Sequence, residues 1–275
     1  MKQGLLNDIL FKIVFGGPQS EPLLAILLNA LLELRGDQRI IELSILNPNI
    51  HKAFETDKGI VLDVRARDAT GRQYNIEVQL RDQASYIQRS LYYVSRLYTE
   101  QLVKGSHYSK LAKTIGISIV DFIAFPDNKP FHSRFRFHDA AQNLQLTDWI
   151  EMHYLELPKF ELLQPHTSFE TWLYTLKYSD LFLDAANPVP QFMEEEEGVM
   201  MAIEAMRKAY ATDEVRELIL AQQKFLLDQN SLIEEATERA KLEGKLEVAK
   251  ALLARGMDRQ EVAMVSGLPV GDLPI

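Results

Sequence analysis

The chain has 275 residues, of which 47% are hydrophobic and 25% are charged, and its formal net charge is -9. This composition is typical of a folded globular protein, and the length favours about two structural units. The absence of cysteine excludes disulfide frameworks, thiolate metal sites and cysteine nucleophiles. The N-terminus lacks the layout of a secretory signal, and the apolar stretch from Leu23 to Leu34 is too short to span a bilayer. We therefore expect a cytoplasmic protein without a membrane partner.

The net negative charge opposes binding to nucleic acid, because phosphate binding depends on lysine and arginine. The charge is unevenly distributed, however. Residues 191–275 contain 10 Lys+Arg and 17 Asp+Glu, whereas residues 81–118 contain six basic and two acidic residues. The acidic excess lies mainly in the C-terminal part, and the central segment is locally positive.

The periodicity of apolar residues predicts helices and strands in alternation. Helical segments end at glycines, and the strands are rich in β-branched and aliphatic residues. In chain order, we expect helices from Leu5 to Phe15 and Glu21 to Glu33, strands from Arg39 to Leu46, Gly59 to Arg67 and Gln73 to Leu80, a helix from Ala84 to Lys104 and a buried strand from Thr114 to Phe125.

The segment from Phe131 to His138 alternates strictly between phenylalanines and the polar residues His132, Arg134, Arg136 and His138. This pattern predicts a strand. Two interpretations of its polar face stay open, namely contact with DNA and simple exposure to solvent.

A boundary is expected where prolines and four consecutive glutamates interrupt the periodicity, from Pro188 to Glu197. We predict one domain over residues 1–190 and a helical region over residues 191–275. Long amphipathic helices are expected from Gly198 to Gln229 and from Ser231 to Arg255, and a helix of this kind favours docking or self-association as a homo-oligomer. The last residues resemble the first helix and turn of a helix-turn-helix, but too few residues remain for a recognition helix.

Acidic residues interrupt two neighbouring predicted strands. Asp63 lies in the first, and Glu77 and Gln79 lie on one face of the second. A hairpin centred on Thr70 places Asp63 directly opposite Glu77, at a Cβ separation of roughly 4.5 to 5.5 Å. Two carboxylates at this distance repel each other unless a proton or cation intervenes.

Hard oxygen ligands without a nearby histidine favour Mg²⁺ or Mn²⁺ over zinc. The six histidines show no tight metal-ligand spacing, and the sequence has no glycine-rich phosphate loop, so we expect no nucleotide cofactor. The alternative is a surface hairpin on which Asp63, Glu77 and Gln79 are solvated residues without chemistry.

The segments around these residues resemble a known nuclease family. The run Leu62-Asp63-Val64-Arg65-Ala66, the turn that ends at Gly71, and Tyr74-Asn75-Ile76-Glu77-Val78-Gln79 are similar to the D…ExQ form of the D…ExK nuclease motif. The chain resembles the PD-(D/E)XK nuclease family transposases, or recombination-promoting nucleases, over about residues 1–165 and around residues 242–268. Further similar segments are residues 8–16, Leu28-Asn29, 89–93 and 155–160.

This resemblance implies an α/β fold with a restriction-endonuclease-like core, a mixed sheet flanked by helices, and a helical C-terminal extension. It also implies metal-dependent cleavage of DNA and a link to recombination or mobile elements. On this basis Asp63 and Glu77 are metal ligands, and Gln79 stands where a lysine is usual. Glutamine supplies only a neutral dipole in place of the lysine charge. Because the family that the chain resembles has the glutamine form of the motif, we interpret Gln79 as a tolerated variant that positions water or phosphate.

Two helices contain further candidates. Asp8 and Lys12 are one helical turn apart, and from the first helix they are candidates for a third metal ligand and a phosphate or water contact; an exposed ion pair is the alternative. On the helix after the motif, Arg89 and Arg96 are candidates for contacts with the DNA backbone. Tyr92 and Tyr93 share that face, where packing is an equal explanation.

The leading hypothesis is a Mg²⁺-dependent endodeoxyribonuclease with Asp63, Glu77, Gln79 and Lys12 as catalytic residues. The rival hypothesis is a catalytically weak or inactive protein that keeps the nuclease fold and binds DNA or acts as a scaffold. Gln79 and the negative net charge favour the rival. Nothing in the residues indicates strand transfer.

Overall fold

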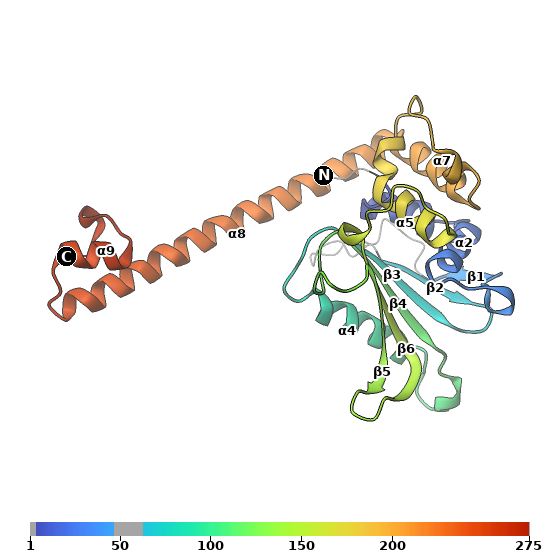
Figure 1. Cartoon of the computed structure of the whole chain (residues 1–275), viewed down its shortest axis with the longest axis horizontal. Coiled ribbons are helices and arrows are strands. Elements are labelled where there is room, and N and C mark those ends of the chain that lie inside the picture. The colour runs from blue at the N-terminus through green and yellow to red at the C-terminus, as the bar shows by residue number, and fades with distance from the viewer. Residues whose placement is uncertain (1–3, 47–62, 275) are drawn as a thin grey trace. The chain divides into compact units, whose positions relative to one another are not determined.

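The computed structural model describes residues 4–46 and 63–274. The chain forms two compact units, Met1–Arg216 and Glu217–Ile275. The first is an α/β structure in which helices flank a mixed sheet, and the second is helical (Figure 1). This is the predicted fold class. Within the described residues, no helix combines the length and the apolar character needed to cross a membrane.

A six-stranded sheet forms the centre of the first unit. Its strands are β1 (Leu43–Ile45), β2 (Val64–Asp68), β3 (Gln73–Gln79), β4 (Thr114–Val120), β5 (His132–Asp139) and β6 (Leu144–Glu156). Their order in the sheet is β1-β2-β3-β4-β6-β5. β4 pairs in parallel with β3 and β6, and the other neighbours are antiparallel. The parallel step from β3 to β4 requires a crossover, which helix α4 (Tyr86–Thr99) provides.

Helices cover both faces of the sheet (Figure 1). α4 packs on one face, where Val94 meets Gly116 of β4, and the N-terminal helices pack on the other, where Gly16 meets Val64 of β2. The helices of the first unit besides α4 are α1 (Asp8–Gly16), α2 (Glu21–Leu31), α5 (Ser168–Tyr178), α6 (Gln191–Glu194) and α7 (Val199–Tyr210). Short 3-10 helices are η1 (Gly36–Gln38), η2 (Tyr108–Lys110), η3 (Leu157–Lys159) and η4 (Ser179–Phe182).

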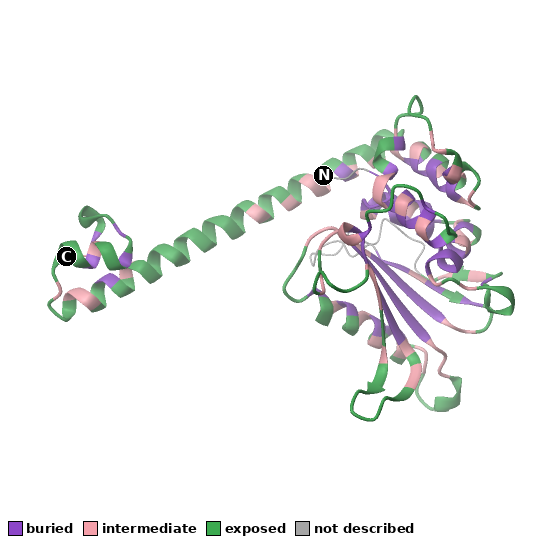
Figure 2. Ribbon diagram, in the orientation of Figure 1, coloured by how far each residue is buried: buried purple, intermediate pink, exposed green. Residues whose placement is uncertain are grey.

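The core lies on both sides of the central strands, which Figure 2 shows as almost wholly buried. Every residue of β4 is buried, as its predominantly apolar sequence predicts. On the α4 side, the rings of Tyr86 and Tyr154 meet edge to face with centroids 6.4 Å apart. On the other side, the rings of Phe15 of α1 and Trp172 of α5 also meet edge to face, with centroids 6.0 Å apart. The sheet is therefore fixed from both faces.

The first strand is shorter than the sequence predicts. The side-chain amide of Asn29 donates to the Ile40 carbonyl and accepts from the Ile40 amide, both at 2.8 Å. These bonds occupy the backbone groups that a strand from Arg39 onwards would use, so pairing begins only at Leu43. Of the strand predicted from Gly59 to Arg67, residues 59–62 lie outside the described residues and the remainder forms β2.

The first unit extends beyond residue 190, where the sequence predicted the domain boundary. Ala202, Ile203 and Met206 of α7 are fully buried, and α7 packs against α1. The following helix, α8 (Asp213–Ala254), begins after Thr212, whose hydroxyl accepts from the Val215 amide. The predicted break near residue 230 is wrong, because α8 continues through it; the interruption lies at residues 211–212 instead.

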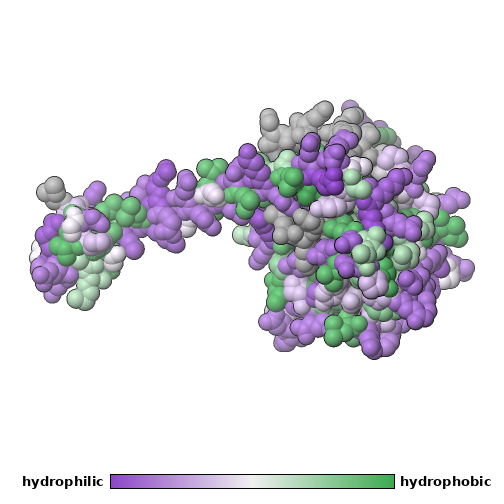
Figure 3. Space-filling model, turned by 90° about the horizontal axis from the view of Figure 1, so that it is seen from above, coloured by the Kyte–Doolittle hydropathy of each residue, from purple (hydrophilic) through white to green (hydrophobic). Residues whose placement is uncertain are grey.

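The second unit contains most of α8 with α9 (Arg259–Ser266) and η5 (Val270–Asp272). Its small core contains Ala249, Val262, Leu268 and Leu273. The three-residue η5 follows α9 where a helix-turn-helix would have its recognition helix. Much of the α8 surface is hydrophilic in the space-filling view, with separate hydrophobic positions along it (Figure 3).

Candidate functional site

Two carboxylates face each other across the β2–β3 hairpin. The antiparallel register pairs Val64 with Ile76, and Asp63, which directly precedes β2, continues this register opposite Glu77. The hairpin register is therefore the one that a turn centred on Thr70 predicts. Asp63 and Glu77 are only 6% and 7% exposed. Two acidic groups thus lie nearly buried at one end of the hairpin, on the face that α4 covers.

The environment of Glu77 favours its protonated form. Burial raises the pKa of Glu77 from 4.5 to about 7. Asn75 Nδ2 opposes this rise by donating to Glu77 Oε1 at 3.0 Å, whereas the negative charge of Asp63 adds to it. Near neutral pH Glu77 is therefore about half protonated, and either a proton or a cation relieves the repulsion between the two carboxylates.

Two cationic side chains contact Asp63. Arg65 Nε donates to Asp63 Oδ2 at 2.6 Å, and Lys12 Nζ donates to the Asp63 carbonyl at 3.0 Å. The Lys12 side chain passes Gly16 and Val64, and a Cβ on Gly16 would lie 2.8 Å from Lys12 Cδ. Burial lowers the pKa of Lys12 to about 8, although the charge of Asp63 opposes the shift. α1 thus brings an amine with a lowered pKa to Asp63, and the predicted contact of Lys12 with phosphate or water stays a prediction.

Gln79 is engaged at both polar ends of its side chain. Its Oε1 accepts from Arg89 Nη2 at 2.7 Å, and its Nε2 donates to the Arg81 carbonyl at 2.9 Å. Arg89 Nη1 also donates to Gln83 Oε1 at 2.6 Å, and the guanidinium lies 5.2 Å from the Tyr86 ring centroid. Arg89 therefore belongs to the site, where the sequence had suggested only a contact with the DNA backbone.

Two buried polar atoms beside Glu77 have no hydrogen-bond partner among the described residues, namely Asn75 Oδ1 and Arg89 Nε. Buried polar atoms are usually hydrogen-bonded, so an amide oxygen without a partner beside two carboxylates fits a further metal ligand. Residues 4–46 and 63–274 contain no group of three or more His, Asp or Glu side chains suited to a metal ion. The available donors are the Asp63 and Glu77 carboxylates with the Asn75 amide oxygen, which are hard ligands that suit Mg²⁺ or Mn²⁺.

The remaining predicted site residues lie on the same two helices. Asp8 is in the first turn of α1, where its Oδ1 accepts from the amide of the next residue at 3.0 Å. Arg96 forms an ion pair with Glu100 at 2.6 Å, and both side chains are about half exposed. Roles for Asp8 as a metal ligand and for Arg96 as a DNA contact stay predictions.

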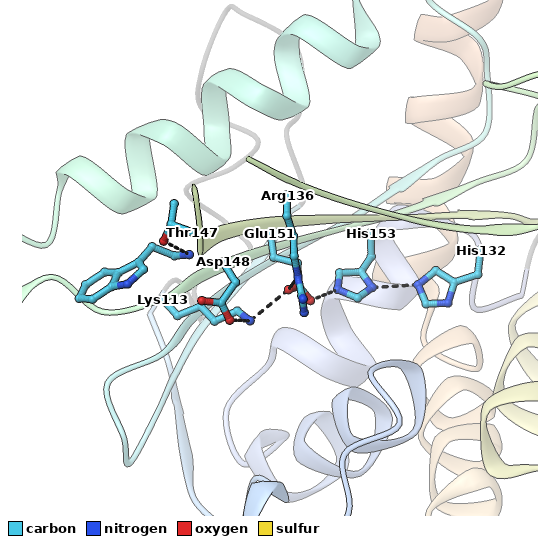
Figure 4. Close-up of polar contacts among 8 residues, drawn as sticks. Lys113, His132, Arg136, Thr147, Asp148, Glu151 and His153 are labelled. Atoms are coloured by element: carbon cyan, nitrogen blue, oxygen red, sulfur yellow. Dashed lines mark hydrogen bonds and ion pairs between the residues drawn. The ribbon is translucent and has the colours of Figure 1, made fainter. Parts of the chain in front are cut away.

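A second polar cluster lies on the sheet face opposite α4, and the sequence analysis missed it because β6 was not predicted. Figure 4 shows its side chains in a line across β4, β5 and β6. The contacts are Glu151 with Lys113 (3.0 Å), Arg136 (2.5 Å) and His153 (2.7 Å), Lys113 with Asp148 (3.0 Å), and His153 with His132 (2.8 Å).

Glu151 is the centre of this cluster. Burial alone would raise the pKa of Glu151, but the bonds from His153, Arg136 and Lys113 outweigh it and hold the pKa well below its usual range. Burial lowers the pKa of His132 to about 4, with a further contribution from His153. The charges in the cluster compensate one another, so we interpret it as a support for the β5–β6 hairpin. This assigns a structural role to His132 and Arg136, which the sequence left open.

A mixed sheet flanked by helices, with a carboxylate-bearing hairpin next to the crossover helix, defines a nuclease-like α/β protein. Residues 5–236 match the model of the PD-(D/E)XK nuclease family transposase, and the chain belongs to this family. PD-(D/E)XK nucleases generally use divalent metal ions, and the family implies DNA as the substrate. Neither the curated proteins nor the solved structures contain a match to the chain.

Proposed function

We propose that the chain is a divalent-metal-dependent DNA endonuclease that hydrolyses phosphodiester bonds at the Asp63–Glu77 hairpin. The observation that most supports this is the pair of opposed, nearly buried carboxylates surrounded by Lys12, Arg65 and Arg89. Hydrolysis concentrates negative charge on the phosphate oxygens, and fixed cations stabilise that charge. Family membership supports the same function.

In this proposal Asp63 and Glu77 hold Mg²⁺ or Mn²⁺, with Asp8 as a further candidate ligand. Such an ion supplies an activated water and offsets charge on the phosphate. The water oxygen bonds to phosphorus, the bond from phosphorus to the leaving sugar oxygen breaks, and a proton ends on that oxygen. In the proposal Lys12 assists this transfer, which its lowered pKa of about 8 supports, because such an amine can exchange a proton near neutral pH.

Nicking of supercoiled plasmid DNA tests the proposal. The chain is incubated with Mg²⁺ or Mn²⁺ and, separately, with a chelator. Asp63→Asn and Glu77→Gln keep the side-chain volume, and we expect each to lower the nicking rate by on the order of 100-fold. Glu197→Gln is the matched control, because Glu197 is an exposed carboxylate paired with Arg39. If Asp63→Asn and Glu77→Gln nick DNA as fast as Glu197→Gln, the catalytic site is not at Asp63 and Glu77.

Self-association through the C-terminal helices remains part of the proposal. Leu220 and Leu227 of α8 are seven residues apart, so they share one helix face, and they are 61% and 59% exposed. This face is the candidate for contacts between copies. Sedimentation of the whole chain and of Leu227→Glu tests this, and a monomer at all concentrations rejects it. The link to recombination and the cytoplasmic location are proposals that rest on the family and on the sequence.

An inactive scaffold is the second candidate. It is favoured by Gln79, whose amide is engaged at both ends within the protein and supplies no charge. This candidate predicts that a labelled duplex is retained without cutting and that Mn²⁺ does not raise the melting temperature. Metal-dependent nicking that requires Asp63 rejects it.

A further inference from the structure

We propose that Arg89 is the catalytic cation of this site, supplied by α4, and that Gln79 is a positioning residue that holds it. In the D…ExK motif a lysine stands at the position of Gln79. Here the positive charge comes from a different element and reaches the same place through the glutamine. This inference rests on the proposed nuclease function and assigns the phosphate contact within it.

The engagement of Gln79 is the first step. Gln79 Oε1 accepts from Arg89 and Gln79 Nε2 donates to the Arg81 carbonyl, so the amide links the end of β3 to α4. The protein holds both ends of this neutral amide, so its position is fixed, although each end keeps one further hydrogen-bonding site. We therefore assign the phosphate contact to Arg89, the cation that Gln79 holds.

The state of the Arg89 charge is the second step. Among the described residues, its guanidinium donates to two neutral amide oxygens, those of Gln79 and Gln83. In the described part of the chain, no ion pair joins Arg89 to a carboxylate, whereas Arg65 pairs with Asp63 and Arg96 pairs with Glu100. An arginine fixed by neutral groups keeps its charge for an anion.

The location of that charge is the third step. Arg89 is near enough to Glu77 for its charge to lower the pKa of this carboxyl, and its Nε is buried without a partner. The guanidinium carbon lies 5.2 Å from the centroid of the Tyr86 ring, within the range of a cation–π interaction. A planar group with five N–H donors suits a phosphate, because it offers parallel hydrogen bonds to two phosphate oxygens.

The packing of α4 makes this arrangement possible. A Cβ on Gly116 would lie only 2.4 Å from Val94 Cγ2. The missing side chain of this glycine therefore allows α4 to approach the sheet closely. The hydroxyls of Ser90 and Tyr154 meet at 2.6 Å and fix the same helix. Arg89 is next to Ser90 in the sequence, so these contacts also fix the distance between the Arg89 backbone and β3.

The test separates a contact with the reacting phosphate from a general DNA contact. Arg89→Gln, Gln79→Lys/Arg89→Gln and the matched surface control Arg39→Gln are compared with the wild-type chain. The rate constant of plasmid nicking is measured at saturating protein with Mn²⁺. Affinity for a fluorescein-labelled duplex is measured separately by anisotropy with Ca²⁺ in place of Mn²⁺. Circular dichroism and melting temperature establish that each variant is folded.

We expect Arg89→Gln to lower the saturated rate by on the order of 100-fold and to change DNA affinity by less than about threefold. The double variant restores a cation at position 79, so it is expected to recover at least about tenfold of the lost rate. Arg39→Gln should match the wild type. Because the double variant is compared with Arg89→Gln itself, a general loss of packing does not produce this recovery.

Two results would overturn the inference while the nuclease function stands. One is an Arg89→Gln variant that binds DNA weakly but nicks at the wild-type rate when saturated, which makes Arg89 a backbone anchor. The other is a double variant that is as slow as Arg89→Gln. A folded wild-type chain that does not nick DNA with any divalent metal overturns the proposed function and this inference together.

Discussion

Gly116 on β4 lies directly beneath Val94 on α4, with Val94 Cγ2 2.4 Å from the position that a Cβ on Gly116 would occupy. Separations this short are essentially never seen, so a larger residue at position 116 requires the Val94 side chain or the helix that bears it to shift. Arg89 is on the same helix, and its contacts with Gln79 depend on the height of α4 above the sheet. This one glycine therefore connects the packing of the core to the geometry of the candidate site.

Gly116→Ala is expected to destabilise the first unit by about 1–3 kcal/mol, the usual cost of overpacking a well-packed core. Urea unfolding followed by tryptophan fluorescence measures this, because Trp149 and Trp172 both lie in the first unit. Val94→Ala removes the clashing methyl groups, so the double variant should regain part of the loss. Val94→Ala alone is the control for the loss of the valine side chain. A Gly116→Ala variant as stable as the wild type would contradict a tight contact between positions 116 and 94.

The raised pKa of Glu77 predicts how stability depends on pH in the presence of a chelator. In the unfolded chain the group loses its proton near pH 4.5, and in the folded chain near pH 7. The folded state therefore binds more protons between these values, and its stability falls as pH rises from about 4.5 to about 7. The full change is on the order of 3 kcal/mol.

Urea unfolding of wild type and Glu77→Gln at several pH values across this window checks the sign. Glutamine cannot ionise, so the variant should lack this component of the decline. The difference in unfolding free energy between the two chains should therefore shift steadily in favour of Glu77→Gln up to about pH 7 and then level off. A difference that is independent of pH contradicts the assigned environment of Glu77.

The buried carboxylate of Glu151 predicts a large effect far from the candidate site. It is 4% exposed and accepts from Lys113, Arg136 and His153. Glu151→Gln leaves two cations without their common partner and is expected to destabilise the first unit by about 3–5 kcal/mol. Asp148→Asn is the control. It breaks a bond to the same Lys113, but its side chain is 47% exposed, so the loss should stay below about 1 kcal/mol. Similar losses for both variants would argue against a buried network.

Local patterns in the sequence determined much of the fold and the register of the hairpin. The turn around Thr70 fixes which residues of β2 and β3 face each other, so Asp63 and Glu77 were placed correctly from spacing. β6 was missed although Ile150 to Tyr154 alternates between apolar and polar residues, a period typical of a strand. The alternation shifts at Asp148 and Trp149, and the burial of Glu151 and His153 depends on partners far along the chain, namely Lys113, Arg136 and His132.

Helix α5 offered a signal that the sequence analysis did not use. Thr167 and Glu170 form a capping box, a pattern that marks a helix start. The contact between Gln79 and Arg89 could not be predicted in the same way. It joins residues on different elements, and it depends on how close α4 lies to the sheet, which Gly116 determines. Sequence periodicity describes single elements and not the distance between them.

Lys12 offers a test that separates activity from stability. Its side chain is 2% exposed, its pKa is lowered to about 8 by burial, and its amine donates to the Asp63 carbonyl at 3.0 Å. Methionine is similar in length and removes the buried charge, so Lys12→Met is expected to change the unfolding free energy by less than about 1.5 kcal/mol. If Lys12 assists proton transfer, the same variant should nick plasmid DNA more slowly by on the order of 100-fold.

Lys177→Met is the matched control for Lys12→Met. Lys177 also donates to main-chain carbonyls in the first unit, those of Leu157 and Phe160, but it lies on α5 away from the carboxylates. Its replacement should leave the nicking rate within about twofold of the wild type, since no reacting group depends on it. A Lys12→Met variant that is folded, binds the duplex and nicks at the wild-type rate would show that Lys12 supports the end of β2 and takes no part in the reaction.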